Sequence, residues 1–119
     1  MEDEYIMFIY KTTNKINGLI YIGQHIYKKE IKNPKYYLGS GTLLLESIKE
    51  YGRQNHEREI LEYCDTFKEL NDREIYWIEK YNSINPEIGM NISAGGSQCL
   101  PTERYRQSMK SEERLKKIL

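Results

Sequence analysis

The sequence is short of several features that would assign a chain to a class at once. Its 119 residues include 2 cysteines, 3 prolines, 2 phenylalanines and 1 tryptophan, and its formal net charge is zero. No apolar run approaches the ~18 residues that a membrane-spanning helix needs. The acidic start "MEDEY" also lacks the basic residues of a secretory signal. We therefore expect a cytoplasmic chain with no membrane partner.

The scarcity of cysteine and the absence of net charge exclude further kinds of site. Cys64 and Cys99 have no metal-ligand spacing with the two histidines, so we expect reduced thiols and no zinc centre. A chain without excess basic residues does not bind nucleic acid through bulk electrostatic attraction. Residues 102–119 are an exception, because they hold six Lys/Arg against three Glu. Any contact with nucleic acid would therefore rest mainly on this tail or on a local patch.

Tyrosine is the residue in excess, with 11 copies, and its ring and hydroxyl favour strands and half-exposed sheets. Two runs rich in aromatic and branched residues, 5–12 and 19–23, flank Asn17-Gly18, which is a hairpin signal. We expect a hairpin here. Residues 24–41 lack a clear period and contain turn-forming residues, so we expect a loop.

The turn type decides which residues of this hairpin face each other. With a two-residue turn at Asn17-Gly18, Tyr10 lies opposite His25. Tyr21 then points to the same face, because side chains alternate along a strand. Such a cluster of two phenols and an imidazole is either cross-strand packing or a catalytic face.

The remaining elements are two helices and one strand. Apolar spacing predicts a short helix over 42–51 that ends at Gly52, and alternation predicts a strand over 59–64. Thr66 and Glu69 form a capping box that opens a second, better-marked helix. The fold class is therefore α+β, a small three-stranded sheet, mixed or antiparallel, built from the N-terminal hairpin and one further strand and flanked by helices.

Two polar residues stand in apolar surroundings. Glu74 falls in the apolar stripe of the second helix, and a buried carboxylate needs a cation, a metal ion or strong hydrogen-bond donors. The alternative is that Glu74 lies at the edge of the stripe and pairs with Arg73 or Lys28 at the surface. Asn91 lies between two apolar residues and either has a functional role or ties down a turn.

Four segments together resemble the GIY-YIG nucleases. "FIY" at 8–10 and "YIG" at 21–23 resemble the two-part signature of that family. "REIYWI" at 73–78 is similar to its helix with the metal-binding glutamate, and "GMNIS" at 89–93 to its terminal segment with an asparagine. "YIGQH" with "YYLGSG" further resembles the phage-type homing endonucleases. "SEERLKKIL" in the tail is similar to the start of a modular DNA-binding repeat.

The resemblance implies a Mg²⁺-dependent endonuclease, with Mn²⁺ as a substitute, that cuts double-stranded DNA by hydrolysis and leaves 5′ phosphate and 3′ hydroxyl ends. Tyr21 matches the general base and Tyr10 its hydrogen-bonding neighbour. Glu74 matches the single protein ligand of the metal ion, which suits an ion that keeps several waters. His25 would supply a proton relay or a positive charge, and Asn91 would orient Glu74 or a phosphate oxygen.

Two positions depart from the family pattern. Phe8 replaces the first glycine of the signature, which we expect to affect packing more than chemistry. The family's helix arginine falls on Ile31, so the phosphate clamp must come from elsewhere. Lys28, Lys29 and Arg53 are the candidates, with the hairpin histidine as a further one.

The resemblance leaves several readings of the whole chain open. Residues 1–96 would be the catalytic domain and residues 97–119 a basic helical tail or the start of a DNA-binding region that selects the site. The alternatives to a homing enzyme are a restriction-type or repair-type nuclease and a catalytically inactive DNA-binding module. A phage-encoded chain would act in the host cytoplasm.

Overall fold

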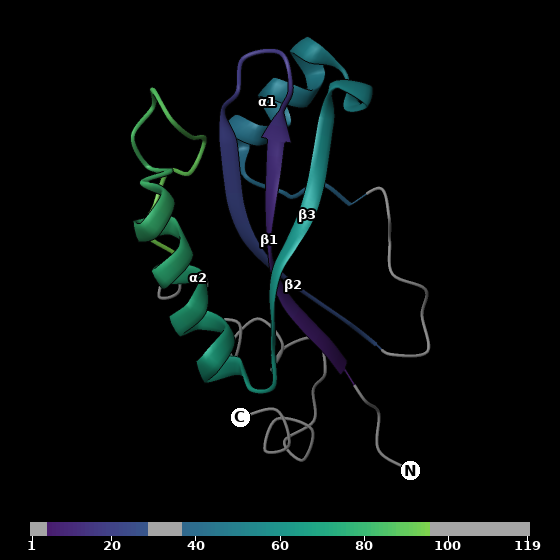
Figure 1. Ribbon diagram of the computed structural model, residues 1–119. Helices are drawn as coiled ribbons and strands as arrows, with labels where there is room; N and C mark the ends of the chain where they lie inside the picture. Colours follow the sequence, from purple (N-terminus) through teal and green to yellow (C-terminus); the bar gives the residue numbers. More distant parts are fainter. Residues whose placement is uncertain (1–4, 29–36, 96–119) are drawn as a thin grey trace.

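The computed structural model describes residues 5–28 and 37–95 (Figure 1). The elements in chain order are β1 (Tyr5–Asn14), β2 (Ile20–Lys28), α1 (Thr42–Tyr51), the 3-10 helix η1 (Arg53–Asn55), β3 (His56–Cys64) and α2 (Phe67–Tyr81). The tail predicted over 97–119 lies outside the described residues. No helix in the described ranges is both long and apolar enough to span a bilayer.

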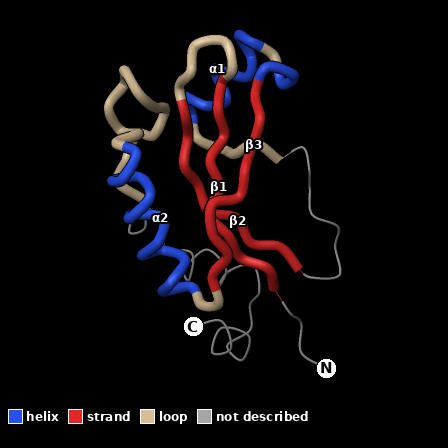
Figure 2. Tube along the Cα trace, viewed as in Figure 1, coloured by secondary structure: helices blue, strands red, loops and turns tan. Residues whose placement is uncertain are grey.

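The three strands form one antiparallel sheet in the order β2-β1-β3, with β1 in the centre (Figure 2). This confirms the α+β class and the sheet of a hairpin plus one strand, and it decides between a mixed and an antiparallel sheet. α2 lies along one side of the sheet, and α1 lies near the end at which β1 and β2 are connected (Figure 1).

The register of the hairpin differs from the prediction. Tyr10 pairs with Gly23, and His25 pairs with Phe8, so the expected opposition of Tyr10 and His25 is wrong. The displacement is two residues along the strand. Because side chains alternate with a period of two, an even displacement keeps Tyr10, Tyr21 and His25 on one face. The shared face was therefore predicted correctly from an incorrect register.

The physical reason for the register is a longer turn than the sequence indicated. β1 continues to Asn14, and β2 begins only at Ile20. The side-chain oxygen of Asn14 accepts hydrogen bonds from the backbone N–H groups of Ile16 and Asn17. This Asx-type geometry organises the turn from the end of β1.

The second strand is also longer than predicted, because residues 24–28 continue β2 where the sequence indicated a loop. These residues pair with the first half of β1, from Tyr5 to Ile9. A strand partner is available along this whole stretch, and Ile26 and Tyr27 suit a strand intrinsically. The expected strand beginning at residue 59 likewise starts earlier, at His56.

The sheet is covered on both faces. On the α2 side, the core consists of buried Ile9, Ile22, Cys64, Leu70 and Ile78. On the other side, Phe8, Tyr10 and Thr12 of β1 are fully buried, and the segment that begins at Tyr37 covers Tyr10 and Thr12. The hydroxyl of Thr12 donates to the carbonyl of Leu38, which fixes that covering segment to the sheet.

Both predicted helices have the expected ends. Gly52 caps α1 with a φ of 90°. Thr66 caps α2 by accepting a hydrogen bond from the N–H of Glu69, and the Glu69 carboxylate accepts from the N–H of Asp65. Cys64 is a buried free thiol, and burial raises its pKa to about 12.

A buried polar chain closes the end of the molecule near the hairpin turn. Nδ1 of His56 contacts the carbonyl of Gly52 at 2.7 Å, so this nitrogen carries the proton, because a carbonyl only accepts. Nε2 of His56 then accepts from the Ser47 hydroxyl at 2.8 Å. The Asn14 amide donates to the same hydroxyl oxygen at 2.8 Å. We call Asn14, Ser47 and His56 the turn network.

Candidate active site

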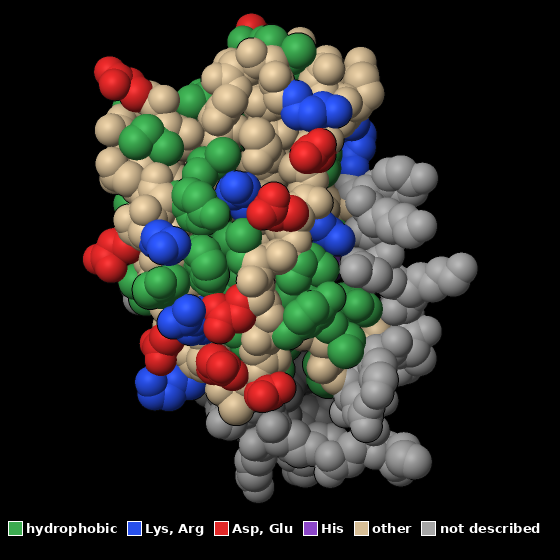
Figure 3. Space-filling view, viewed as in Figure 1, with side chains coloured by type: hydrophobic (Ala, Val, Ile, Leu, Met, Phe, Trp, Pro, Cys, Tyr) green, Lys and Arg blue, Asp and Glu red, His purple; other side chains and the backbone are tan. Residues whose placement is uncertain are grey.

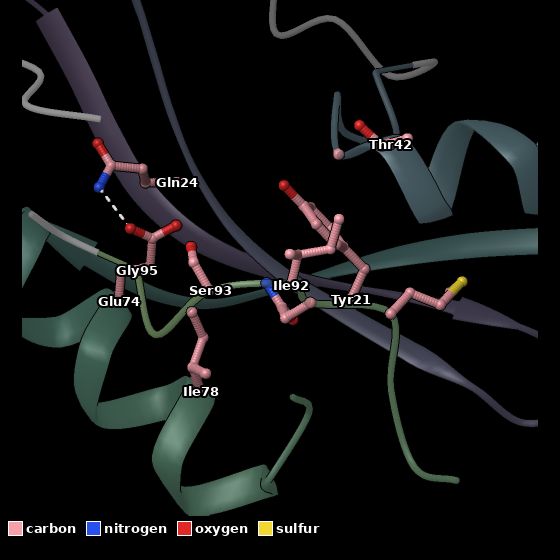
Figure 4. Close-up of a pocket in the computed structure, with 11 residues that line it drawn as sticks. Tyr21, Gln24, Thr42, Glu74, Ile78, Ile92, Ser93 and Gly95 are labelled. Atoms are coloured by element: carbon pink, nitrogen blue, oxygen red, sulfur yellow. Dashed lines mark hydrogen bonds between the residues drawn. The ribbon is translucent and has the colours of Figure 1, made fainter. Parts of the chain in front are cut away.

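A pocket opens at the edge of β2 (Figure 4). Its lining comes from β2 (Tyr21, Gln24), the start of α1 (Gly41, Thr42), α2 (Glu74, Ile78) and five residues of the segment 90–95. The two residues that the family resemblance marks as base and metal ligand, Tyr21 and Glu74, therefore line the same pocket although they come from different elements. The aromatic ring of Tyr21 and the carboxylate of Glu74 are both visible in Figure 4.

Tyr10 lies beneath Tyr21 and is 1% exposed. The centroids of these two rings are 6.2 Å apart, and the Tyr10 ring is 6.0 Å from that of Tyr37. Burial, with the neighbouring Tyr21 and Tyr37, raises the pKa of Tyr10 well above its ordinary value. Tyr10 is therefore a neutral phenol at pH 7 and a hydrogen-bond donor, and not a base.

Glycines make room for these two tyrosines. A Cβ atom on Gly23 would lie 2.5 Å from the hydroxyl oxygen of Tyr10, its partner in the sheet. A Cβ atom on Gly41 would lie 2.5 Å from a ring carbon of Tyr21. These contacts are too short for any side chain. The "YIG" segment and "GSG" at 39–41 thus meet around the two phenols, and the glycines allow the close approach.

Glu74 is held by a residue that the sequence analysis did not single out. Nε2 of Gln24 donates to Oε1 of Glu74 at 2.8 Å and to Oδ1 of Asn71 at 3.0 Å (Figure 4). Arg73, which the sequence left as a possible partner of Glu74, instead donates to the carboxylate of Glu62 at 2.7 Å. The carboxylate of Glu74 thus lies at the pocket with a fixed hydrogen-bond partner.

Asn91 ties the pocket wall to the edge of β2. Its side-chain oxygen accepts from the N–H of Ile22 at 2.8 Å, and its side-chain nitrogen donates to the carbonyl of Ile22 at 2.9 Å. The backbone of Ile20 makes similar bonds to Ile88 and Met90. The amide of Asn91 therefore continues this ladder. It contacts the backbone of a strand next to Tyr21 and not that of a turn, and its role toward Glu74 or phosphate stays a prediction.

His25 lies on the tyrosine face but does not line the pocket. Its ring stacks on Tyr37 with centroids 4.1 Å apart and planes at 21°. Burial, assisted by the nearby charge of Arg58, lowers the pKa of His25 to about 4. The imidazole is therefore neutral at pH 7 in the chain alone, which argues against its supplying a positive charge. A proton relay by the neutral ring stays a prediction.

Arg58 is a second residue that the sequence analysis missed. Its guanidinium lies 5.2 Å from the ring centroid of Phe8 and 6.0 Å from that of Tyr10, and it donates to the carbonyl of Tyr37. Phe8 itself is fully buried, which agrees with the packing role expected for this departure from the family signature. Arg58 could have been found only from the register of β3, where it pairs with Thr12.

The candidates for the phosphate clamp are distributed around the molecule. Lys28 ends β2 opposite Tyr5, and Arg53 is exposed in η1. Lys29 and the family's arginine position, Ile31, lie outside the described residues. Within residues 5–28 and 37–95, the pocket lining contains no Lys, Arg or His.

The donor set fits one kind of metal site. Across the described part of the chain, no three His, Cys, Asp or Glu side chains gather into a cluster. The pocket offers the single carboxylate of Glu74 with one of its oxygens bound to Gln24. Mg²⁺ suits such a site, because it is usually bound by one or two carboxylates and keeps waters and phosphate oxygens as its other ligands.

Comparison with known proteins gives concordant matches. Residues 1–91 match the family model described as "Putative endonuclease segE, GIY-YIG domain". The chain is 36% identical over 89 residues to putative endonuclease segB of Enterobacteria phage T4, covering 75% of this chain and 38% of the relative. It is 33% identical over 112 residues to endonuclease segA of the same phage, covering 92% and 48%.

A solved structure agrees with these matches. A mutant form of the catalytic domain of intron endonuclease I-TevI superposes with a TM-score of 0.59 and 25% identity, covering 76% of this chain and 96% of that domain. The chain spans less than half the length of segB and segA. Because the family model covers most of the chain, this protein belongs to the segE-type GIY-YIG endonuclease domain family.

Proposed function

We propose that this domain is a Mg²⁺-dependent DNA endonuclease that hydrolyses phosphodiester bonds and leaves 5′ phosphate and 3′ hydroxyl ends. The observation that carries the proposal is that Tyr21 and Glu74 line one pocket. Membership of the endonuclease domain family and the likeness to the I-TevI catalytic domain support the same reaction class.

Four residues at or beneath the pocket would have roles in this reaction. Glu74 would hold the metal ion, which supplies positive charge to activate a water and to neutralise the phosphate oxygens when it is bound. Tyr21 would accept the proton of the attacking water. Tyr10 stays neutral because it is buried, and it would be the hydrogen-bonding neighbour of Tyr21. Asn91 would keep β2 and the opposite pocket wall together.

The substrate follows from the same chemistry and from the relatives. We propose double-stranded DNA, cut by a homing-type enzyme of which this chain forms the catalytic part. On the face shown in Figure 3, acidic and basic side chains are interspersed, without a broad field of one sign. Residues 1–96 hold 12 Lys/Arg against 15 Asp/Glu, and a domain without excess basic residues gains little from counterion release. We therefore expect weak DNA binding by residues 1–96 and a larger share from the basic residues after 101.

A plasmid nicking assay tests the proposal. Wild type with Mg²⁺ should convert supercoiled plasmid to nicked or linear forms, and EDTA should stop the reaction. Glu74→Ala and Tyr21→Phe should lose at least about 100-fold in rate, since each removes a group that acts on the reacting atoms. Glu79→Ala, an exposed carboxylate on the same helix, is the matched control and should cut like wild type.

Two outcomes would contradict the proposal. Full cleavage by Glu74→Ala would remove the metal-binding role. No Mg²⁺-dependent cleavage by a wild-type chain that still binds DNA would favour an inactive DNA-binding module. The pocket lining, which has no basic side chain within the described ranges, is the observation that keeps this second reading in the test.

A further inference from the structure

We propose that Gln24 is a positioning residue that fixes the carboxylate of Glu74 for metal binding. The inference rests on the proposed function, because it concerns the same metal site. Neither the family signature nor the relatives' descriptions assign a role to this residue, which directly follows the "YIG" segment.

The carboxamide of Gln24 reaches α2 through a single nitrogen. Its two N–H groups are directed to Oε1 of Glu74 at 2.8 Å and to Oδ1 of Asn71 at 3.0 Å. These acceptors lie one helical turn apart on the same face of α2. The orientation of the amide follows from its partners, because the flipped amide would direct its oxygen against a carboxylate.

This contact restrains the carboxylate of Glu74 at the pocket that it lines, because Oε1 accepts from the amide of Gln24. On the other side, a Cβ atom on Gly95 would come within 3.3 Å of Cγ and Cδ of Glu74, so the chain packs closely on the carboxylate stem. A long side chain held from two sides loses little further rotamer freedom when it binds an ion. Partners of this kind orient metal ligands in proteins generally.

The competing explanation is that Gln24 only ties β2 to α2. The two hydrogen bonds of Gln24 allow an experiment to distinguish a purely structural tie from positioning of the carboxylate. The bond to Asn71 joins strand and helix without touching the carboxylate. Removing Asn71 therefore weakens the tie and spares the bond to Glu74, whereas an apolar isostere of Gln24 removes both.

The experiment compares Gln24→Met, Asn71→Ala and Glu74→Ala in the full chain. Metal binding is measured without DNA, as the Mn²⁺ concentration that broadens the backbone NMR signals of residues around position 74. The Mg²⁺ dependence of plasmid nicking and the thermal unfolding midpoint are measured in parallel. We expect Gln24→Met to need about 10-fold to 100-fold more metal in both assays, the usual effect of losing a partner of a metal ligand. Asn71→Ala should have the metal affinity of wild type.

The outcomes separate the inference from the proposed function. If Gln24→Met binds Mn²⁺ like wild type while Glu74→Ala does not, positioning is refuted and the metal site stands. If Gln24→Met and Asn71→Ala lose equal metal affinity and equal thermal stability, Gln24 is only a tie. If wild type neither binds Mn²⁺ nor nicks DNA, the proposed function fails and the inference fails with it. Gln24→Ala provides the same test should the methionine variant not fold.

Discussion

The molecule contains two polar clusters that are built from similar side chains and differ in how they are closed. In the turn network of Asn14, Ser47 and His56, all three residues are buried, and both ring nitrogens of the histidine have partners. The pocket cluster of Gln24, Asn71 and Glu74 is only partly buried and borders a pocket. A closed network specifies one packing, whereas one that borders a pocket can be reached by a ligand.

The two histidines show the same difference. His56 is fully hydrogen-bonded, and its tautomer is fixed by the carbonyl of Gly52. His25 is stacked on Tyr37, and its Nε2 has no hydrogen-bond partner among the described residues. A buried nitrogen without a partner is more easily recruited by a substrate or a relay than one that is already bonded. Substitutions in the two regions should therefore act on different quantities.

The largest effect on stability is expected for His56→Ala. The change empties a buried ring site, removes the ring N–H that donates to the Gly52 carbonyl and removes the acceptor of the Ser47 O–H, so the free energy of unfolding should fall by about 3 kcal/mol. Urea unfolding measures this loss. Cleavage per folded molecule at low temperature should stay at the wild-type rate. A loss of cleavage in the folded fraction would show that the turn network also serves the site.

Asn91→Ala should lower both stability and cleavage, because Asn91 is buried in the pocket wall and its side chain bonds the backbone of Ile22. Two backbone groups of Ile22 lose their partners, and the cost should be about 2 kcal/mol. Cleavage should also fall, because Tyr21 precedes that backbone. Ile84→Ala, at an exposed position outside the pocket lining, is the control for urea unfolding and nicking. An unchanged unfolding free energy for Asn91→Ala would contradict the ladder.

Gly23→Ala tests the close approach of the β2 backbone to the phenol of Tyr10. The added methyl group would meet the Tyr10 hydroxyl at 2.5 Å, and overpacking of this kind costs about 1.5 kcal/mol. Cleavage should fall as well, because Tyr10 and Tyr21 share this space. Gly18→Asn, at an open turn position with a φ of 80°, is the control in thermal unfolding, since asparagine tolerates that region. Wild-type behaviour of Gly23→Ala would show that the two rings have room to move.

The last effect is absent at neutral pH: it is the pH dependence of stability that His25 contributes. Its pKa of about 4 in the folded chain lies below the ordinary 6.5, so the unfolded chain binds the proton first as the pH falls. This contribution to stability is complete above pH 6.5 and is lost between pH 6.5 and 4. Thermal midpoints of wild type should therefore fall more steeply over this range than those of His25→Gln. Equal slopes would contradict the burial of a neutral ring beside Arg58.

Much of the fold was predictable because its signals are local. The helix over 42–51 and the capping box at Thr66 depend on neighbours within one or two turns, and both were confirmed. The turn between the first two strands was not, because its length depends on hydrogen bonds from the side chain of Asn14. The strand residues 24–28 were missed because a partner strand, more than their own sequence, makes them extended.

The candidate site likewise contains residues that the sequence predicted and residues that only the structure revealed. Tyr21 and Glu74 were identified from motif spacing, and the structure brings them to one pocket. Gln24 and Arg58 carry no motif, and their importance depends on contacts across 47 to 50 residues of sequence in one case and on cross-strand register in the other. The neutral state of His25 likewise follows from burial, which no spacing rule reports.

The sequence by itself determined the order of the elements, the shared face of Tyr10, Tyr21 and His25, and the family, because strand alternation and motif order are properties of the chain. Only the tertiary structure decided the register, the partner of Glu74 and the backbone contacts of Asn91. Those depend on which edge of the sheet meets which turn of α2. The physical reason is that a hydrogen bond acts over about 3 Å in space, whereas the residues it joins at this pocket are separated by up to 69 positions in the chain.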